Sequence, residues 1–184
     1  MDAWSEALGD AAPAPALTLV LGGARSGKSH WGERLIRAAA GAATPVYVAT
    51  AEALDDEMAE RIARHQAERG RNWRTIEAPH DLPAAIREDA ETPMLVDCLT
   101  LWLSNRLLAE ADLAADRAGL IAALAGRSGP TVVVSNEVGL GLVPDNRLGR
   151  AFRDAQGTLN REVAAKADCV LFVAAGLPLV MKRS

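Results

Sequence analysis

The chain has 184 residues, of which 49% are hydrophobic and 24% charged, proportions typical of a globular protein and unlike those of a disordered one. This length suits a single domain that can bury its own core. The formal net charge of −4 argues against nucleic acid as a partner, because nucleic-acid binding usually needs a basic face.

The N-terminal stretch, residues 1–16, carries three acidic residues and ends in an Ala/Pro-rich tail. We expect it to be a flexible lead-in and not a secretory signal, which needs a basic start and an apolar centre. No apolar run in the chain approaches the ~20 residues that span a bilayer, so the sequence predicts no membrane insertion.

From Leu17 onward, short apolar runs alternate with segments of helical length. We predict strands at 17–21, 46–50, 73–77, 93–97, 131–135, 169–174 and 179–182, and helices at 28–40, 55–69, 82–89, 99–109, 113–125 and 146–167. This alternation is typical of an α/β fold with a mostly parallel sheet and helices on both faces, here one domain over residues 17–184. Ligands of such sheets bind at the carboxyl ends of the strands.

The two cysteines, Cys98 and Cys169, lie far apart and lack the spacing of a zinc site. They predict neither a disulfide framework nor structural zinc, as expected of a cytoplasmic protein in a reducing compartment.

A phosphate-binding loop follows the first predicted strand. The run Gly22-Gly23-Ala24-Arg25-Ser26-Gly27-Lys28-Ser29 matches the pattern G-x-x-x-x-G-K-[ST], with a strand before it and a helix after it. The glycines allow backbone N–H groups to point at phosphate oxygens, and the helix N-terminus adds partial positive charge. We expect Lys28 to reach the β- and γ-phosphates and the Ser29 hydroxyl to bind Mg²⁺.

An acidic residue at the end of another buried strand would complete such a site. Asp97 follows the predicted strand core 94–96 and is the first candidate to hold Mg²⁺, directly or through water. Glu137, after the strand at 131–135, is the second candidate.

The phosphate-binding loop alone leaves a kinase, a motor NTPase, a GTPase switch and a nucleotidyltransferase open. The chain has no N-K-x-D motif for reading guanine, and it is too short for a large motor apparatus. Product formation would separate a small-molecule kinase from a regulatory module that senses nucleotide without turnover.

His65 differs from the other two histidines, His30 and His80, in its helical context. Met58, Ile62 and His65 are spaced i, i+4 and i+7, so they form one stripe that faces the sheet or a cleft. This spacing favours a half-buried structural histidine. The alternative is a nucleophile that attacks the α-phosphorus of a nucleotide, with arginines close by to spread the developing charge.

Motifs along the chain together resemble one family. They comprise the phosphate-binding loop, Tyr47–Ala51, Asp55–Met58 with Arg61, Ile62 and His65, Trp73–Glu77, Ser135–Gly139, Val143-Pro144, Asn146-Arg147, Phe152–Asp154 and Asn160. The chain resembles, over about residues 17–182, the bifunctional adenosylcobinamide kinase/adenosylcobinamide-phosphate guanylyltransferase family of cobalamin biosynthesis.

The resemblance implies a two-step enzyme. ATP or GTP phosphorylates the aminopropanol hydroxyl of adenosylcobinamide, and GTP then guanylylates a histidine with release of pyrophosphate. The GMP passes to adenosylcobinamide phosphate and gives adenosylcobinamide-GDP. By position, His65 matches the guanylylated histidine, and Lys28 is the second implied catalytic residue. The family also implies a RecA-like P-loop fold and a homotrimer.

The nucleotide contacts of the family map onto the phosphate-binding loop and onto four further places. They are Gly22, Gly23, Ala24, Arg25, Ser26, Gly27, Lys28 and Ser29, then Thr50, Ala51 and Glu52, then Gln66, Ala67, Glu68 and Arg69, and finally Glu77 and Asp97. Asp97 is one methylene shorter than the glutamate of some relatives, which favours a contact through Mg²⁺ over a direct one.

Three further features carry weaker expectations. Residues 136–141 form either a substrate loop or a glycine-rich connection. Gly70 and residues 51–54 are candidate hinges for the helix that carries His65. Trp31, Trp73 and Trp102 either stack on a corrin or a base or pack in the core.

Overall fold

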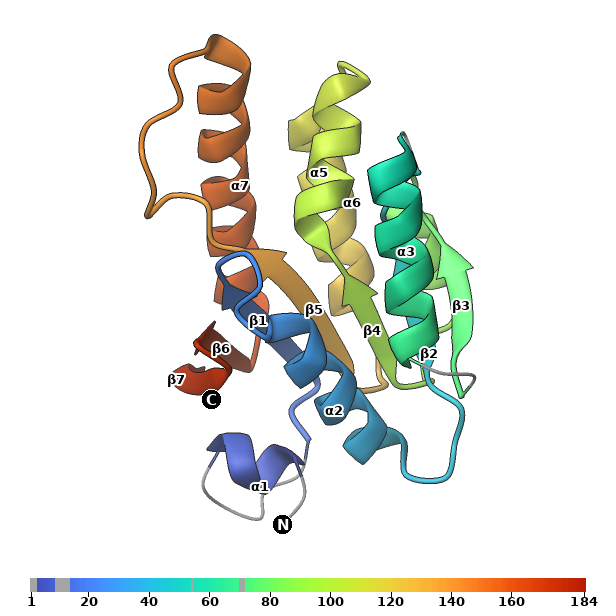
Figure 1. Ribbon diagram of the computed structural model, residues 1–184. Helices are drawn as coiled ribbons and strands as arrows, with labels where there is room; N and C mark the ends of the chain where they lie inside the picture. The colour runs from blue at the N-terminus through green and yellow to red at the C-terminus, as the bar shows by residue number, and fades with distance from the viewer. Residues whose placement is uncertain (1–2, 9–13, 54, 70–71) are drawn as a thin grey trace.

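The computed structural model describes residues 3–8, 14–53, 55–69 and 72–184 (Figure 1). The elements are α1 (Ala3–Leu8), β1 (Leu17–Gly22), α2 (Lys28–Ala40), β2 (Val46–Ala49), α3 (Asp56–Arg69), β3 (Arg74–Glu77), α4 (Leu82–Arg87), β4 (Met94–Asp97), α5 (Leu99–Leu108), α6 (Leu113–Ala125), β5 (Thr131–Asn136), α7 (Arg147–Lys166), β6 (Cys169–Ala174) and β7 (Leu177–Arg183). Every strand and helix predicted from Leu17 onward is present.

The strands form one seven-stranded sheet in the order β3-β2-β4-β5-β1-β6-β7. All neighbouring strands pair in parallel except β6 and β7, which are antiparallel. The mostly parallel α/β sheet is therefore confirmed. Because β1, β2, β4 and β5 run in the same direction, their carboxyl ends meet at one edge, where the predicted nucleotide site lies.

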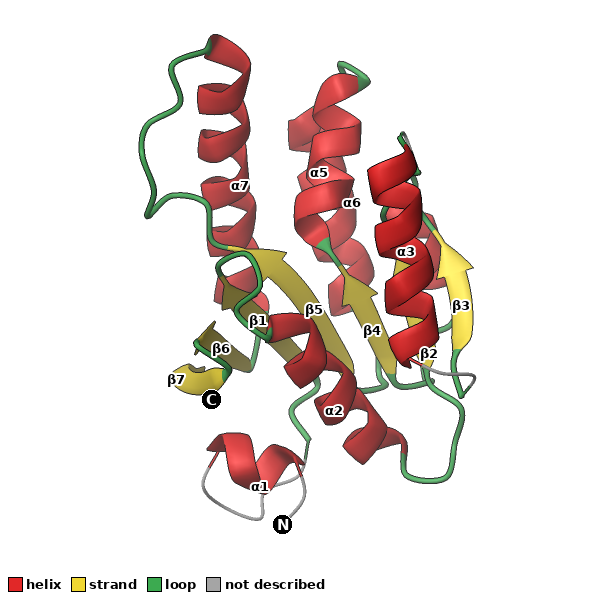
Figure 2. Ribbon diagram, viewed as in Figure 1, coloured by secondary structure: helices red, strands yellow, loops and turns green. Residues whose placement is uncertain are grey.

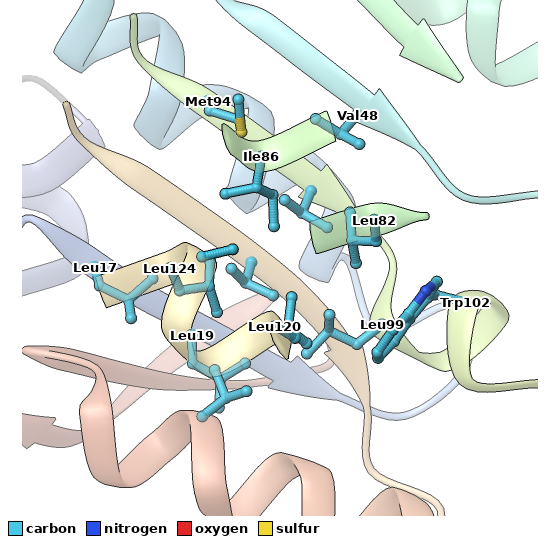
Figure 3. Packing of buried hydrophobic residues seen from close by; sticks show 14 of the residues in the cluster. Leu17, Leu19, Val48, Leu82, Ile86, Met94, Leu99, Trp102, Leu120 and Leu124 are labelled. Atoms are coloured by element: carbon cyan, nitrogen blue, oxygen red, sulfur yellow. The ribbon is translucent and has the colours of Figure 1, made fainter. Parts of the chain in front are cut away.

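Helices cover both faces of the sheet (Figure 2). Each face of the sheet packs against its helices through its own cluster of buried apolar side chains. Under α4 to α7, Leu19 of β1 packs in one cluster with Trp102 and Leu120 (Figure 3). On the other face, Val20 packs with Leu35 under α2. Successive side chains of β1 point to opposite faces of the sheet, and the side chains on both faces are buried. This explains why the strand is a continuous, mainly apolar run and does not alternate between apolar and polar residues.

The N-terminal segment differs in part from the flexible lead-in that the sequence predicts. Residues 3–8 form α1, whose Ala3 and Ala7 are buried in the same cluster as Leu35 of α2. Glu6 of α1 forms an ion pair with Arg34 of α2. A helix this short is stabilised by packing on its neighbour and has no strong pattern of its own. Residues 1–2 and 9–13 of the predicted lead-in lie outside the described residues.

Within the described ranges, no helix combines the length and the apolar character that crossing a membrane requires.

Candidate active site

One cavity lies at the carboxyl edge of the sheet, and residues of α2 and α3 form two of its walls. Figure 1 shows α2 and α3 in front of the sheet. It collects residues from the phosphate-binding loop, β2, α3, β4, α5 and β5. Its lining consists of Lys28, Ser29, Tyr47, Ala49, Ala51, Met58, Ile62, His65, Gln66, Asp97, Cys98, Leu101 and Asn136. Lys28 and Ser29 of the phosphate-binding loop, the strand-end acid Asp97 and the histidine stripe of α3 therefore meet in one cavity, whereas residues 22–27 of the loop are not part of its lining.

The phosphate-binding loop curls between β1 and α2 through two left-handed residues, Arg25 with φ 56° and Gly27 with φ 96°. Glycine adopts the left-handed conformation without steric cost, which fits Gly27 at the start of α2. The buried Lys28 opens α2, and its Nζ donates a hydrogen bond of 3.0 Å to the carbonyl oxygen of Gly23. The ammonium group is thus held over the loop, where phosphate groups would bind.

The turn between β6 and β7 braces this loop from the far side. The N–H of Gly176 donates to the carbonyl oxygen of Ser26 at 2.9 Å, and the indole N–H of Trp31 donates to the carbonyl oxygen of Gly176 at 2.8 Å. Ala175 and Gly176 both have positive φ, the conformation of a tight two-residue hairpin turn. The loop and the first turn of α2 are therefore hydrogen-bonded to this hairpin turn.

Asp97 ends β4, and its carboxylate lies in the cavity that Ser29 also lines. The phenol O–H of Tyr47, two residues before the end of β2, donates to Oδ2 of Asp97 at 3.1 Å. The hydroxyl of Ser29 and the carboxylate of Asp97 are oxygen donors, the ligand type that Mg²⁺ prefers. Glu137, the second candidate acid, instead accepts a hydrogen bond from the N–H of Gly139 and does not line the cavity.

His65 reaches the cavity from α3. The side chain of Asp55 accepts a hydrogen bond of 2.7 Å from the N–H of Met58 and so caps the first turn of this helix. Met58, Ile62 and His65 all line the cavity, which confirms that the predicted stripe faces a cleft. The imidazole therefore shares a single cavity with Lys28 and Asp97.

Comparison with known proteins identifies the family. Proteins described as cobinamide kinase / cobinamide phosphate guanyltransferase match residues 18–181 of the chain. The chain belongs to this family.

Two curated relatives match nearly end to end. The bifunctional adenosylcobalamin biosynthesis protein CobP of Pseudomonas aeruginosa is 46% identical over 168 residues, which cover 89% of this chain and 96% of the relative. The bifunctional adenosylcobalamin biosynthesis protein CobU of Salmonella typhimurium is 41% identical over 183 residues, which cover 90% of this chain and 99% of the relative.

Among solved structures, the flagellar accessory protein FlaH of Methanocaldococcus jannaschii is similar to this chain, with a TM-score of 0.56 at 15% sequence identity. The match covers all of this chain and 85% of FlaH. That likeness shows a shared fold alone.

Thr50, a nucleotide contact implied by the family resemblance, is buried beside the cavity and holds the backbone after Asp97. Its hydroxyl accepts from the N–H of Cys98 at 2.8 Å and donates to the carbonyl oxygen of Cys98 at 2.7 Å, and the Asp97–Cys98 peptide bond is cis. The side-chain amide of Asn105 donates to the carbonyl oxygen of Thr50 at 2.9 Å. Burial raises the pKa of the Cys98 thiol to about 11, so this cavity residue stays protonated.

The other residues implied by the family are distributed around the cavity. Ala51 and Gln66 line it. Glu52 lies beside it, with Oε1 3.2 Å from Nε2 of His80, and Glu77 is exposed on the edge strand β3. The cavity lining does not include Ala67, Ala24 or Arg25, all three of which are exposed. The side chains of Glu68 and Arg69 lie outside the described residues, as do Leu54 and Gly70 of the candidate hinges.

The three candidate tryptophans are all buried. Trp31 braces the hairpin turn, and the indole N–H of Trp102 donates to the carbonyl oxygen of His80 at 2.8 Å. Trp73 packs edge-on against Tyr47, with ring centroids 5.8 Å apart. Their packing in the core is the second of the two predicted alternatives.

Sequence reasoning missed four residues of the cavity, Tyr47, Ala49, Cys98 and Leu101. Tyr47 is the one tyrosine of the chain and carries a polar tip inside an otherwise apolar strand, a pattern that would have indicated a partner near the strand end. Cys98 and Leu101 lie among apolar residues and give no such indication.

Proposed function

We propose that this chain phosphorylates adenosylcobinamide with ATP or GTP and then transfers GMP from GTP to the product, through a guanylyl group on His65. Membership of the cobinamide kinase / cobinamide phosphate guanyltransferase family supports both activities. The observation that carries the assignment of residues is the single cavity that joins Lys28 and Ser29 of the phosphate loop with Asp97 and His65.

In the kinase step, the aminopropanol hydroxyl oxygen bonds to the γ-phosphorus, and the bond from this phosphorus to the β,γ-bridging oxygen breaks. A nucleoside diphosphate leaves, and the hydroxyl proton is released to water. Lys28 Nζ would exchange its bond to the carbonyl oxygen of Gly23 for phosphate oxygens. The buried ammonium charge then opposes the negative charge that develops on the transferring group.

Ser29 and Asp97 fit a magnesium ion because both present oxygen to the same cavity. Over the described part of the chain, no three His, Cys, Asp or Glu side chains form a metal-binding cluster. When bound, Mg²⁺ would neutralise phosphate charge. Tyr47 orients the carboxylate of Asp97 toward this task through its 3.1 Å hydrogen bond.

In the guanylylation step, the ring nitrogen of His65 that carries the lone pair bonds to the α-phosphorus of GTP, and the bond to the α,β-bridging oxygen breaks. Pyrophosphate leaves, and a phosphoramidate remains on the imidazole. A phosphate oxygen of adenosylcobinamide phosphate then bonds to the same phosphorus, the P–N bond breaks, and His65 is restored. The product is adenosylcobinamide-GDP.

We propose further that residues 17–184 act as one catalytic domain and that the enzyme is a cytoplasmic homotrimer. Apolar side chains at the surface, Leu142 at 97% exposure and Leu177 at 72%, offer area for contact between subunits. Light scattering of the purified protein would give the number of subunits directly.

The test of the proposed function is the intact mass after incubation with GTP and Mg²⁺ without a corrinoid. The wild-type protein should gain one GMP in an acid-labile, alkali-stable bond. His65→Ala should gain none while keeping at least part of the kinase activity, and the control His30→Ala, at an exposed position outside the cavity lining, should behave as wild type. If folded wild-type protein binds GTP and forms no adduct, the nucleotidyl step is excluded and a kinase remains.

A further inference from the structure

A buried cluster of polar side chains lies where α7 packs on the end of β5. Ser135 and Gln156 have no exposed surface, and Asn160 has 5%. Ser135 Oγ donates to Asn160 Oδ1 at 2.7 Å, and Gln156 Nε2 donates to both of those oxygens at 2.9 Å. Burying three polar side chains costs free energy unless they form hydrogen bonds with one another. We therefore expect this network to have a structural or functional role.

The network holds the backbone of Asn136, the last residue of β5. The amide of Asn160 donates to the carbonyl oxygen of Asn136 at 3.0 Å. From the other side, the hydroxyl of Thr100 on α5 accepts from the N–H of Asn136 at 2.8 Å. Two helices therefore fix this one strand end, while the Asn136 residue itself lines the nucleotide cavity.

Asn136 occupies the central place at the carboxyl edge. Strand β5 lies between β4, which ends in Asp97, and β1, which leads into the phosphate-binding loop. Asn136 pairs in register with Gly22, the first residue of that loop, and the N–H of Glu137 donates to the carbonyl oxygen of Gly22 at 3.1 Å. A phosphoryl group bound between Lys28 and Asp97 would lie next to Asn136.

We propose that Asn136 is a catalytic residue of the kinase step, whose Nδ2 donates a hydrogen bond to an oxygen of the γ-phosphoryl group during transfer, and that Asn160 is its positioning residue. This inference rests on the proposed function. A carboxamide fits the role because it donates without titrating, so it adds no charge beside Asp97. Bond making and breaking are those of the kinase step, and Asn136 gains and loses no proton.

The first test is Asn136→Ala. The backbone bonds to Thr100 and Asn160 do not involve the side chain, so the variant should fold. We expect kcat of phosphorylation to fall about 10²- to 10³-fold, as when one preorganised donor to developing charge is removed, with less than about a threefold change in KM for the corrinoid. The matched control is Asn72→Ala. Asn72 is exposed and precedes β3, so it lies at the amino ends of the strands, away from the cavity.

The second readout uses no acceptor. Because Asn136 is proposed to contact the γ-phosphoryl group alone, Asn136→Ala should weaken binding of GTP relative to GDP by about tenfold and leave the affinity for GMP unchanged, as measured by calorimetry. Asn136→Leu, which is similar in shape, carries no charge and lacks the N–H donor, should show the same loss and serves if the alanine variant does not fold. Asn160→Ala should lower the GTP-to-GDP preference by a smaller factor.

A folded Asn136 variant that keeps kcat and the GTP-to-GDP preference within about twofold of wild type overturns the proposal. So does an equal loss of GTP, GDP and GMP binding, because that pattern indicates a structural role. If the wild-type protein does not phosphorylate the corrinoid, the proposed function fails, and the GTP-to-GDP preference of the variants still tests the γ-phosphate contact.

Discussion

Gly22 and Gly23 are adjacent at the start of the phosphate-binding loop, but alanine should destabilise the protein at Gly22 and leave its stability nearly unchanged at Gly23. A Cβ on Gly22 would lie 2.4 Å from Ser26 Oγ and 2.5 Å from the carbonyl oxygen of Val173. The serine hydroxyl can rotate away, but the carbonyl belongs to β6, which pairs with β1 at this position. A Cβ on Gly23 would meet nothing within 4 Å.

The cost of Gly22→Ala follows from these contacts. Forcing one methyl group into a packed region typically costs about 1–3 kcal/mol when backbone must move. For a domain of this size each kcal/mol lowers Tm by roughly 2–4 °C, so we expect a fall of about 2–12 °C. Movement of the loop would also weaken GTP binding, by about fivefold to 150-fold if the same energy is needed to restore the binding geometry.

Thermal unfolding of the nucleotide-free variants, followed by circular dichroism, gives the comparison, and calorimetry with GTP gives the affinity of Gly22→Ala. Gly23→Ala should melt within about 1 °C of wild type, which is the matched control. The steric reasoning is refuted if Gly22→Ala melts within about 1 °C of wild type, or if Gly23→Ala is the less stable of the two.

Two further predictions concern the residues around Asp97. Tyr47→Phe removes the O–H that donates to Asp97, so the Mg²⁺ concentration for half-maximal kinase activity should rise several-fold; a metal titration that matches wild type would exclude this role of Tyr47. Cys98 contributes a pH dependence of stability, because burial raises its pKa from 9.0 to about 11. As the pH rises, the Cys98 thiol ionises at a lower pH in the unfolded chain than in the folded chain. Its contribution to the free energy of unfolding is therefore complete below pH 9 and is lost as the pH rises toward 11. Urea unfolding at pH 8 and pH 11 gives the free energy of unfolding at each pH. Between these pH values it should fall by about 2–3 kcal/mol more for the wild type than for Cys98→Ala, and an equal fall would contradict the burial argument.

The sequence predicts those parts of the fold and site that local patterns encode. The strands, the helices, the phosphate-binding loop and the histidine stripe of α3 each depend on residues a few positions apart. The contacts that orient the site join distant residues: Trp31 and Gly176 are 145 positions apart, and Tyr47 and Asp97 are 50 apart. No periodicity reports such pairs, because they depend on the order of strands in the sheet. The helix α1 was missed for a related reason, since its stability comes from α2.

The groups proposed for the two reactions differ in how firmly the fold holds them. Lys28, Asp97 and Asn136 lie on or beside strands whose side chains form the two core clusters. His65 lies on α3, and of the α3 residues that the structure describes none belongs to either cluster. A helix with few buried apolar contacts opens at a lower free energy than the core strands, so α3 should exchange its amide hydrogens faster than β4 or β5. Such a difference suits the proposed chemistry, because one cavity must present a nucleophile to the α-phosphorus in one step and admit a corrinoid hydroxyl to the γ-phosphorus in the other. The fixed strand ends would then define the position of the phosphates in both steps, and adjustment of α3 alone would decide which phosphorus reacts.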